Sequence, residues 1–487
     1  MHNKPFYITT TLPYVNAPLH MGHALEFIRA DTIARYKKLA GFDVYFNTGT
    51  DEHGMKIFEK AEQAGQSAQD FVDASFLTFK NSVQIFGLTD DIHYIRTTDK
   101  QHEAIAQDFW MRCFDNGYIY KKNYQTKYCV GCESEKTDSD LVDGECPDHP
   151  GRALEIIEEE NYFFKYSAFT DKLLELYKNN PSFVVPDFRF NEIKAFVERG
   201  LQDFSISRLK TKMPWGIPVP NDSEHVMYVW FDALTNYIST LALDGIDTVD
   251  ALVASEAFKT YWVHGTPTQY CGKDNLRFQS AMWQAMLLAS GLPNSHQIVI
   301  NGFITADGGL KMSKTLGNVV DPKDIVEEFG TDALRYFLLK EVSSFEDSPF
   351  TRERFLASYN SGLANGLGNL ASRILTLSEK YLDGCPEIAE NSIPQEFFDY
   401  LEKFDIAKAC EFLWAEITAL DKYIQQNEPF KTIKVDELKG KEQITELVVR
   451  LYTVARMLNP IMPETNATLK ALIKANKKPA EPLFLRK

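Results

Sequence analysis

Two histidines stand three residues apart near the start of the chain, in the segment His20-Met21-Gly22-His23. Placed at the beginning of a helix, two imidazoles with a glycine between them can approach a phosphate. Free backbone N–H groups and the helix dipole already favour negative charge at such a position. The segment therefore predicts contacts with the phosphates of a nucleotide such as ATP, although an isolated His-x-x-His segment is weak support for catalysis.

Two lysines with the same spacing occur much later in the chain, in Lys311-Met312-Ser313-Lys314-Thr315. The glycine pair Gly308-Gly309 precedes this segment, and Gly317-Asn318 follows it. A loop of this kind can fold over a triphosphate and neutralise the charge that develops as pyrophosphate leaves. A solvated surface loop is the alternative interpretation of this segment when it is considered alone.

A third group of residues has the spacing of metal ligands. Cys129 and Cys132 form one C-x2-C pair, and Cys146 and His149 form a second pair with the same spacing. Three cysteines and one histidine suit a tetrahedral zinc ion, and a closed four-ligand site is structural because no position stays open for chemistry. Asp148 is a poorer fourth ligand because its spacing is wrong. The alternative is a set of reduced thiols in a segment that has lost its metal.

The elements that must position the two histidines follow an α/β pattern. Phe6–Thr11 is rich in β-branched and aromatic residues, Ala24–Leu39 places apolar residues at helical spacing, and Val44–Asn47 has the composition of a second short strand. A strand, a turn, a helix and a strand begin a parallel sheet with right-handed crossovers. The sequence therefore predicts a Rossmann-type nucleotide-binding domain.

Changes in composition and in apolar spacing divide the rest of the chain into segments. A turn-rich segment with clustered cysteines, from about Tyr118 to Val226, predicts an insertion domain, and apolar runs suggest that the sheet then resumes at Tyr228–Phe231, Tyr261–His264 and Gln297–Ile300. Long helical patterns after about Ala357 predict a C-terminal helix bundle. We expect two Rossmann halves at residues 1–117 and 228–303, with an insertion that carries the zinc knuckle between them at residues 118–227. A linking region at residues 304–356 and a helical domain at residues 357–487 follow.

The overall composition is that of a folded protein that occupies a reducing compartment. The chain has 487 residues, a net charge of −16 and seven cysteines, of which three are clustered. No signal peptide, transit peptide or membrane span is evident, so we expect a cytoplasmic protein. The net charge argues weakly against nucleic acid, but Lys431 to Lys487 contains twelve Lys and Arg against six Asp and Glu.

The histidine and lysine segments, in this order, resemble the two signatures of class I aminoacyl-tRNA synthetases. Further blocks narrow the resemblance to the methionyl-tRNA synthetases, from about Phe6 to Pro463. These blocks are Thr50–Gly54, Glu159–Phe164, Ser205–Arg208, Trp215–Pro218, Tyr228–Ala233 and Gly272–Asp274.

This resemblance implies a two-step reaction. The methionine carboxylate attacks the α-phosphorus of ATP, which gives methionyl-adenylate and pyrophosphate, and a hydroxyl of the terminal adenosine of tRNA(Met) then attacks the activated carbonyl. The resemblance places His20 and His23 at the α-phosphate, and Lys311 and Lys314 at the leaving pyrophosphate, where Mg²⁺ shares the charge.

The same resemblance assigns the binding residues. It places Asp51 at the α-amino group of methionine. The residues that it places around the methionine side chain are Leu12, Tyr14, Trp230, Ala233 and Tyr237. It assigns ATP to Tyr14, Gly22, Gly272, Asp274 and the two lysines of the later segment. In the helical domain, Asn369, Arg373 and Phe430 correspond to residues that contact the anticodon, where an aromatic face can stack on an unpaired base.

The chain departs from the family pattern at a few positions. Asn275 stands where an aliphatic residue is usual, Gln279 where a histidine is usual, and Leu234 where a proline is frequent. Gln279 can preserve a neutral polar contact, and we expect Asn275 to point away from the thioether. The role of Arg208, which resembles an arginine near the active site, is not assigned by the sequence.

Three other interpretations remain open. A class I synthetase for leucine, isoleucine or valine would carry a longer editing insertion than residues 118–227 allow, and a cysteinyl enzyme would place zinc in its amino-acid pocket. A synthetase-like protein without catalysis, acting as a tRNA-binding module, is the third. No appended dimerisation module follows the helical domain, so we expect a monomer.

Overall fold

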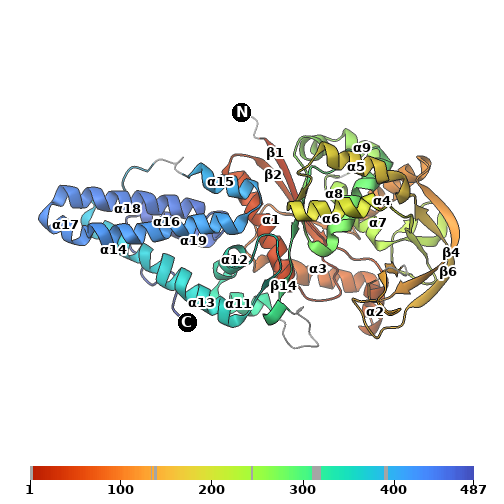
Figure 1. Cartoon of the computed structure of the whole chain (residues 1–487), viewed down its shortest axis with the longest axis horizontal. Coiled ribbons are helices and arrows are strands. Elements are labelled where there is room, and N and C mark those ends of the chain that lie inside the picture. Colours follow the sequence, from red (N-terminus) through yellow and green to blue (C-terminus); the bar gives the residue numbers. More distant parts are fainter. Residues whose placement is uncertain (1–3, 133, 137–139, 243–244, 310–319, 389–392) are drawn as a thin grey trace.

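The structure is a computed structural model, and it describes residues 4–132, 134–136, 140–242, 245–309, 320–388 and 393–487. Figure 1 shows an elongated molecule in which a body built around a parallel sheet carries a helix bundle at one end and an antiparallel sheet at the other.

The body is organised around six parallel strands in the order β3-β2-β1-β12-β13-β7. Their bounds are β1 Pro5–Thr10, β2 Asp43–Thr50, β3 His93–Arg96, β7 Val184–Val185, β12 Thr268–Gly272 and β13 Gln297–Asn301. The chain leaves β1 through α1 (Met21–Leu39) toward β2, whereas it leaves β12 through α10 (Trp283–Ser290) toward β13, on the opposite side. The strand order therefore reverses between β1 and β12, which is where α/β sheets bind nucleotides. The prediction of a Rossmann-type sheet is confirmed.

Helix α1 is buried over most of its length because it lies between the parallel sheet and helices of the C-terminal part of the chain (Figure 1). Even its charged residues Glu26, Arg29 and Asp31 are buried. Arg29 donates to the carbonyl oxygens of Val342 and Ser344 at 3.2 and 3.0 Å, so its charge is compensated by backbone acceptors. The helix that begins at the two histidines is thus fixed on both sides.

Other helices pack against the sheet or against the helices that cover it. They are α2 Met55–Gln63, α3 Ala68–Gln84, α4 Lys100–Asp115, α5 Thr170–Asn179, α6 Asp187–Glu198, α7 Val229–Leu234, α8 Asn236–Ser239, α9 Val249–Ala254, and the π-helical segments η3 Phe258–Val263 and η5 Phe278–Met282.

Two apolar runs that were expected to be strands are helical. The run Tyr228–Phe231 lies mainly in α7 and the run Tyr261–His264 in η3, whereas Gln297–Ile300 is the strand β13, as predicted. Short apolar runs cannot be assigned by periodicity, because a buried helix and a buried strand are both apolar on all sides. The true strand β12 contains Thr268 and Gln269, polar residues that are nonetheless buried, and the sequence analysis missed it.

The segment between the halves forms antiparallel sheet. One sheet has the order β5-β4-β6-β8, and a smaller one has the order β10-β11-β9. The bounds are β4 Ile119–Cys129, β5 Ser134–Lys136, β6 Glu155–Phe164, β8 Phe204–Ser205, β9 Ser207–Leu209, β10 Pro218–Val219 and β11 Asp222–Met227. Strand β7 also lies within residues 118–227, but it pairs with β13 in the parallel sheet.

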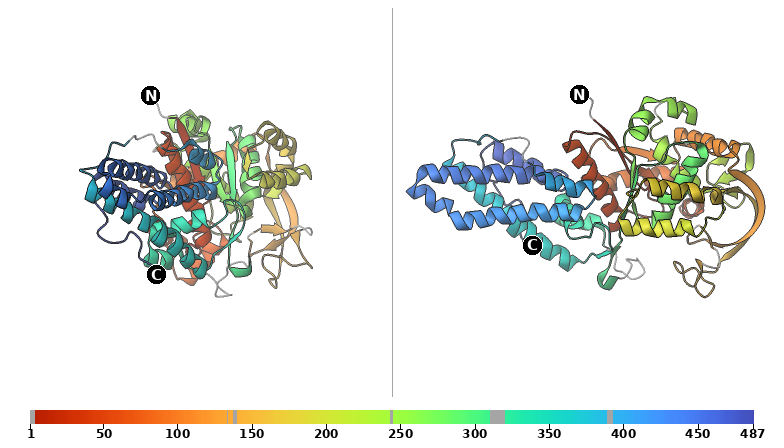
Figure 2. Two further views of the ribbon diagram at one scale, coloured as in Figure 1. Left: turned by 60° about the vertical axis from the view of Figure 1, so that its left-hand side comes forward. Right: turned by 45° about the horizontal axis from the view of Figure 1, so that its top comes forward.

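The C-terminal part is helical, as predicted. Beyond the small pair β14 Ile304–Thr305 and β15 Ser348–Pro349, it contains η6 Asp307–Gly309, α11 Pro322–Phe329, α12 Thr331–Lys340, α13 Arg352–Ser358, η8 Tyr359–Gly368, α14 Asn369–Tyr381, α15 Gln395–Glu402, α16 Ile406–Asn427, α17 Pro429–Val435, α18 Glu437–Met457 and α19 Pro463–Lys474. Figure 2 shows α14, α16, α18 and α19 side by side in a long bundle, with α17 at the end farthest from the sheet. Among the helices in the described ranges, none combines the length and apolar character needed to cross a membrane.

Candidate active site and zinc knuckle

A cavity of about 300 Å³ lies at the carboxyl ends of β1 and β2, next to α7 and η5. All six residues predicted to surround methionine line it, namely Leu12, Tyr14, Asp51, Trp230, Ala233 and Tyr237. The side chain of His23 also reaches its wall. Lys56, Cys132 and Asn236 also line it. No motif predicts these three residues here, because they come from segments too distant in the chain for a local pattern to reveal their contact.

The loops after β1 and β2 hold each other in place. Asp51 donates its backbone N–H to the carbonyl of Pro13 at 3.0 Å, and Val15 donates to the carbonyl of Asp51 at 3.3 Å. The Tyr14 hydroxyl donates to the carbonyl of His53 at 2.6 Å. These contacts hold Asp51, a residue that is 8% exposed, in the wall of the cavity.

A buried pair behind the cavity joins the β2 loop to α7. Nδ1 of His53 lies 3.1 Å from Oδ2 of Asp232. Burial opposes protonation of His53, but the Asp232 carboxylate raises its pKa above the usual value. The pair holds the loop that carries Asp51 against the helix that carries Trp230 and Ala233. On that helix, the Trp230 ring stacks on Phe278 of η5 with centroids 4.0 Å apart.

The two histidines form a reciprocal cap at the start of α1. Nδ1 of His20 accepts from the N–H of Gly22 at 3.1 Å, and Nδ1 of His23 accepts from the N–H of His20 at 3.2 Å. The rings stack with centroids 3.7 Å apart. A Cβ atom on Gly22 would lie 3.0 Å from Cε1 of His20, so glycine leaves the room that this ring needs.

This cap fixes the tautomer of both rings. Because each Nδ1 accepts a backbone hydrogen, each neutral ring carries its proton on Nε2 and can donate it outward. Burial and the neighbouring His20 lower the pKa of His23 to about 3, so His23 is neutral at physiological pH. The pair therefore offers N–H donors beside a helix N-terminus, an arrangement suited to a phosphate.

The ends of β1 and β12 are joined by Glu26 of α1. Its Oε1 accepts from the N–H and hydroxyl of Thr11 at 2.7 and 2.6 Å, and its Oε2 accepts from the N–H of Gly272 at 3.1 Å. Burial raises the pKa of Glu26 to about 8 against the effect of these hydrogen bonds. Gly272 and the exposed Asp274, both predicted to contact ATP, thus lie across the switch point from the histidines. Lys311 and Lys314 lie outside the described residues.

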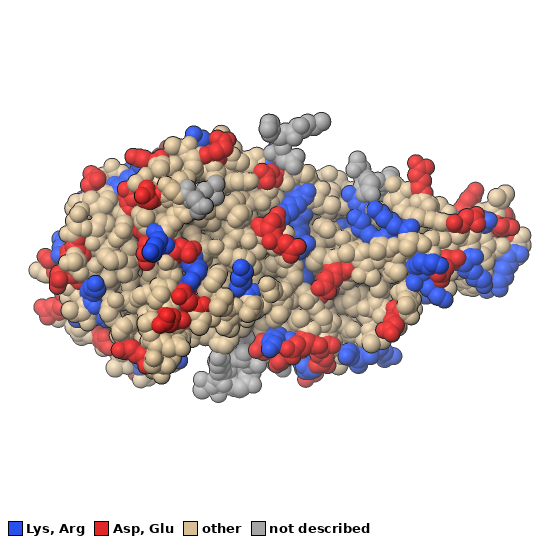
Figure 3. Space-filling view, turned by 180° about the vertical axis from the view of Figure 1, so that it is seen from behind, with Lys and Arg blue, Asp and Glu red and all other residues tan. Residues whose placement is uncertain are grey.

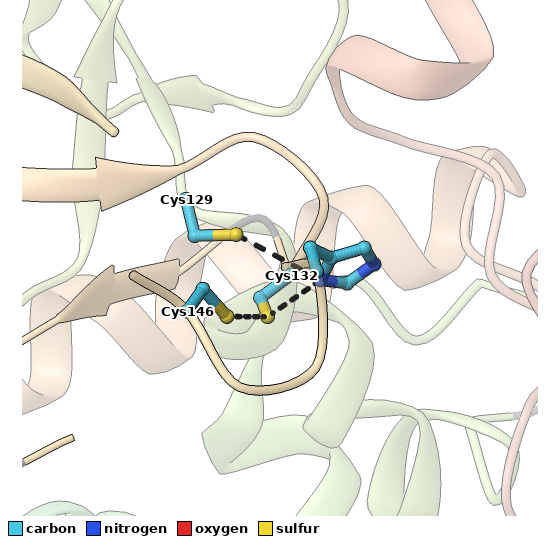
Figure 4. A group of neighbouring side chains, drawn as sticks. Cys129, Cys132 and Cys146 are labelled. Carbon is cyan, nitrogen blue, oxygen red and sulfur yellow. Dashed lines mark hydrogen bonds between the residues drawn. The ribbon is translucent and has the colours of Figure 1, made fainter. Parts of the chain in front are cut away.

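Cys129, Cys132, Cys146 and His149 come together at the end of β4. Figure 4 shows the three cysteine side chains pointing toward one another. One ligand atom from each side chain lies within 4.8 Å of all the others, with 3.4 Å between the sulfurs of Cys132 and Cys146 and 3.2 Å between Cys132 and Nδ1 of His149. This donor set and its spacing fit one tetrahedral zinc ion. The expected cluster is therefore present, with His149 as its nitrogen donor.

The knuckle is packed against the cavity. A Cβ atom on Gly131 would lie 2.5 Å from the His149 ring, so only glycine lets this ring close over the turn. The Gly131 carbonyl accepts from Nζ of Lys56 at 2.7 Å, and both Lys56 and Cys132 line the cavity.

Arg208, whose role the sequence left open, lies buried between the insertion and the entry to α7. Its guanidinium stands 4.8 Å from the ring centre of Tyr228 and 5.4 Å from that of Tyr128, and it donates to Ser205 Oγ and Ser207 O at 2.7 Å. Because Tyr128 precedes Cys129 and Tyr228 precedes Val229 in the chain, Arg208 ties the knuckle strand to the cavity wall.

A second hollow of about 320 Å³ lies on the helix bundle. Arg373 and Phe430, both expected at the anticodon, line it together with Ser372, Thr376, Leu377 and Ile424. The Phe430 ring is 39% exposed, and Arg373 forms an ion pair with Asp421. Asn369 is exposed one turn before Arg373 on the same helix. Figure 3 shows Lys and Arg side chains at the outer end of this bundle, with Asp and Glu side chains among them.

Comparison with known proteins agrees with this architecture. The family model described as tRNA synthetases class I (M) matches residues 6–153 and 149–375. The methionine–tRNA ligase of Caldanaerobacter subterraneus subsp. tengcongensis is 41% identical over 95% of this chain and 73% of its own length. That of Thermosynechococcus vestitus is 39% identical over 95% of this chain and 89% of its own length. The solved Mycobacterium tuberculosis methionyl-tRNA synthetase in complex with methionyl-adenylate superposes with a TM-score of 0.88 at 36% identity, covering 96% of this chain and 94% of that chain.

The fold and the matched model define a class I aminoacyl-tRNA synthetase, a ligase. Within that class, the chain belongs to the methionine–tRNA ligase family.

Proposed function

We propose that this chain activates methionine with ATP and transfers the methionyl group to the 3′ terminal adenosine of tRNA(Met), with release of AMP and pyrophosphate. The observation that carries the proposal is the single cavity that gathers an aromatic and aliphatic wall, the Asp51 carboxylate and His23 at the switch point of the sheet. A ligand with an ammonium group, an apolar side chain and a carboxylate directed toward a nucleotide fits this arrangement.

The amino-acid end is assigned by charge and polarity. Asp51 pairs with the ammonium group of methionine, while Trp230, Ala233 and Leu12 enclose the thioether side chain with polarizable, apolar contacts. Asn275 lines the cavity and donates to Asp274 Oδ1 at 3.3 Å, so its amide has a partner on the nucleotide side.

The nucleotide end is assigned to the groups around the switch point. His20 and His23 donate from Nε2 to the α-phosphate, beside Gly22 and Tyr14, and Gly272 with Asp274 receives the ribose. Lys311 and Lys314 are proposed for the leaving pyrophosphate on the basis of their sequence alone. Mg²⁺ arrives with ATP as part of the substrate. No side chain needs to form a covalent bond, so catalysis is positioning plus electrostatic stabilisation.

The knuckle is proposed as a structural zinc site. Cys129, Cys132, Cys146 and His149 would use all four tetrahedral positions, so the ion would hold the turn in place and not bind substrate. Because Cys132 and Lys56 reach the cavity, zinc would keep this part of the wall ordered.

The bundle is proposed as the anticodon-binding domain. Phe430 would stack on an unpaired base, and Arg373 and Asn369 would donate to base edges from successive turns of α14. We further propose that residues 1–117 and 228–303 form the catalytic halves, residues 118–227 the insertion, residues 304–356 the link and residues 357–487 the helical domain. The proposed setting is the cytoplasm, and the proposed state is a monomer, which light scattering of the purified chain tests.

The test is amino-acid-dependent ATP–pyrophosphate exchange with the twenty standard amino acids. Methionine should support exchange with the highest kcat/KM, and the chain should then charge tRNA(Met). Exchange with leucine, isoleucine, valine or cysteine that equals or exceeds methionine would refute the methionine assignment. Absence of exchange with every amino acid would identify a tRNA-binding module without catalysis. His23→Ala serves as the inactive reference, because it removes one phosphate donor.

A further inference from the structure

A chain of buried side chains leads away from the cavity into the second half of the sheet. It contains Tyr237 of α8, Gln279 of η5, Gln269 of β12, Ser295 of the loop before β13, and Gln284 of α10. Each of these residues is at most 4% exposed. Tyr237 and Gln279 line the cavity, whereas the other three lie behind its wall.

The side-chain amide of Gln284, at the far end of this series of side chains, has only one possible orientation. The backbone N–H of Ser295 donates to Oε1 of Gln284 at 3.1 Å, and Nε2 of Gln284 donates to the backbone carbonyl of Gln279 at 2.8 Å. A backbone N–H can only donate and a backbone carbonyl can only accept, so the Gln284 amide cannot be flipped. Its Nε2 therefore also donates to the Ser295 hydroxyl at 3.1 Å.

This orientation passes along the chain to Tyr237. The Ser295 oxygen accepts from Gln284, and Oε1 of Gln269, 2.5 Å away, is the acceptor that the structure provides for the Ser295 hydrogen. Nε2 of Gln269 then donates to Oε1 of Gln279 at 2.6 Å, and Nε2 of Gln279 donates to the Tyr237 oxygen at 2.5 Å. When the Ser295 hydrogen takes this acceptor, every hydrogen bond up to the cavity has one direction.

The direction of these hydrogen bonds determines where the hydroxyl hydrogen of Tyr237 can point. In the described part of the chain, Gln279 donates to the Tyr237 hydroxyl oxygen, and the Asn236 side chain also acts on this oxygen as a donor. Burial raises the pKa of Tyr237 far above its usual range, so the hydroxyl keeps its hydrogen. That hydrogen is left to point toward a ligand in the cavity.

We propose that Gln269 and Ser295 are specificity-determining positioning residues, which hold the Tyr237 hydroxyl as a hydrogen-bond donor into the cavity. A side chain with an acceptor atom at that depth, such as a thioether sulfur, gains a hydrogen bond that the methylene of norleucine cannot form. This inference rests on the proposed function, because it deepens the choice of substrate at the same cavity.

Without the relay the opposite orientation becomes possible. If Gln279 were flipped, its Oε1 would accept the Tyr237 hydrogen, and the cavity would lose its donor. An isolated glutamine beside a tyrosine permits both orientations, since an amide offers a donor and an acceptor of similar size. The buried partners Gln269 and Ser295 remove this choice.

The experiment compares methionine and norleucine in the ATP–pyrophosphate exchange of the full chain. Gln269→Met removes the donor to Gln279, and Ser295→Ala removes the hydroxyl that orients Gln269. Each variant should lower the methionine-to-norleucine ratio of kcat/KM by about two- to tenfold, as for the loss of one modest hydrogen bond. The KM for ATP should stay unchanged. Ser290→Ala is the matched control, because its buried hydroxyl donates to Leu287 O at 2.9 Å outside the relay, and it should leave the ratio unchanged.

A second arm combines these substitutions with Tyr237→Phe. That variant alone should lower the ratio, and adding Ser295→Ala or Gln269→Met should lower it no further, because the donor is already gone. An unchanged ratio in both folded single variants overturns the proposal, as does an equal further drop in the Tyr237→Phe background. A parent chain that does not activate methionine would instead refute the proposed function, so the two failures are distinguishable.

Discussion

Asp31 and Arg335 form an ion pair with 2.8 Å between Oδ2 and Nη2, and both side chains are fully buried. Asp31 belongs to α1, the helix that begins at the two histidines, and Arg335 belongs to α12. Arg335 also donates to the carbonyl oxygens of Pro460 and Ile461, which lead into α19 of the bundle. The pair therefore connects the nucleotide side of the sheet with the domain proposed to bind the anticodon.

Arg335→Met should lower the free energy of unfolding by about 3 kcal/mol or more, because it leaves a buried carboxylate and several carbonyl oxygens without their cation. Asp31 keeps Arg35 at 2.8 Å, which limits the loss to the lower end of the range for broken buried pairs. Urea unfolding followed by circular dichroism measures the change.

Arg352→Met is the matched control, since Arg352 forms an ion pair with Glu328 on the surface. A surface pair contributes at most about 1 kcal/mol, so this variant should stay close to the parent. Equal midpoints for the two variants would show that the buried pair does not hold the domains together.

His23 should remain neutral throughout the physiological pH range. Its pKa in the folded chain is about 3, held down by burial and by His20, whereas an exposed histidine titrates near 6.5. As pH falls below about 6.5, the unfolded chain takes up a proton that the folded chain does not, so this group lowers stability progressively toward pH 3 and has no effect above pH 7.

Two measurements check this pH dependence. In NMR spectra of histidine-labelled protein, the ring signal that disappears in His23→Asn should not titrate between pH 8 and pH 5. Between pH 7 and pH 5 the unfolding free energy of His23→Asn should also improve relative to the parent by about 1 to 2 kcal/mol. A midpoint near 6.5 for this signal would contradict the neutral donor proposed for the α-phosphate.

Those parts of the fold were predictable whose residue pattern lies within one short segment of the sequence. The segment from Phe6 to Leu39 gave a strand and a helix because their apolar spacing is distinct, and the knuckle was predictable because its four ligands keep a fixed spacing. The run Tyr228–Phe231 was misassigned because α7 is buried on all sides and shows no periodicity. Strand β12 was missed because Gln269 and Thr268 are buried by partners that lie far away in the sequence.

The same distinction applies to the site. The residues around the cavity could be named from motifs, and the structure gathers them in one wall. The contributions of Lys56 and Cys132 to that wall, and the connection from Ser295 to Tyr237, depend on contacts between distant segments. No spacing or composition signals them, because each residue is an ordinary polar residue in its own surroundings.

The purified chain should contain about one zinc ion, and His149→Ala and Cys132→Ser should each lose it, because a tetrahedral site tolerates no missing ligand. Asp148→Ala should retain the ion, although its carboxylate lies 3.9 Å from the Cys132 sulfur. Elemental analysis measures the metal, and limited proteolysis within residues 129–149 reports local order. Zinc loss in Asp148→Ala together with retention in His149→Ala would reverse the assignment of the fourth ligand.

The last prediction concerns Phe430 at the hollow on the bundle. Phe430→Ala should lower kcat/KM for charging a tRNA with a CAU anticodon by roughly tenfold or more, since stacking on one base contributes about 1 to 3 kcal/mol. ATP–pyrophosphate exchange should stay unchanged, because this reaction needs no tRNA and α17, which carries Phe430, lies at the end of the bundle farthest from the sheet (Figure 1). Phe430→Trp should retain charging, because it keeps an aromatic face beside Arg373. Phe188→Ala removes another exposed phenylalanine, on α6, and should affect neither reaction. If Phe430→Ala charges tRNA as fast as the parent, the ring only packs against Ile424 and Leu377, and the anticodon must be bound elsewhere on the bundle.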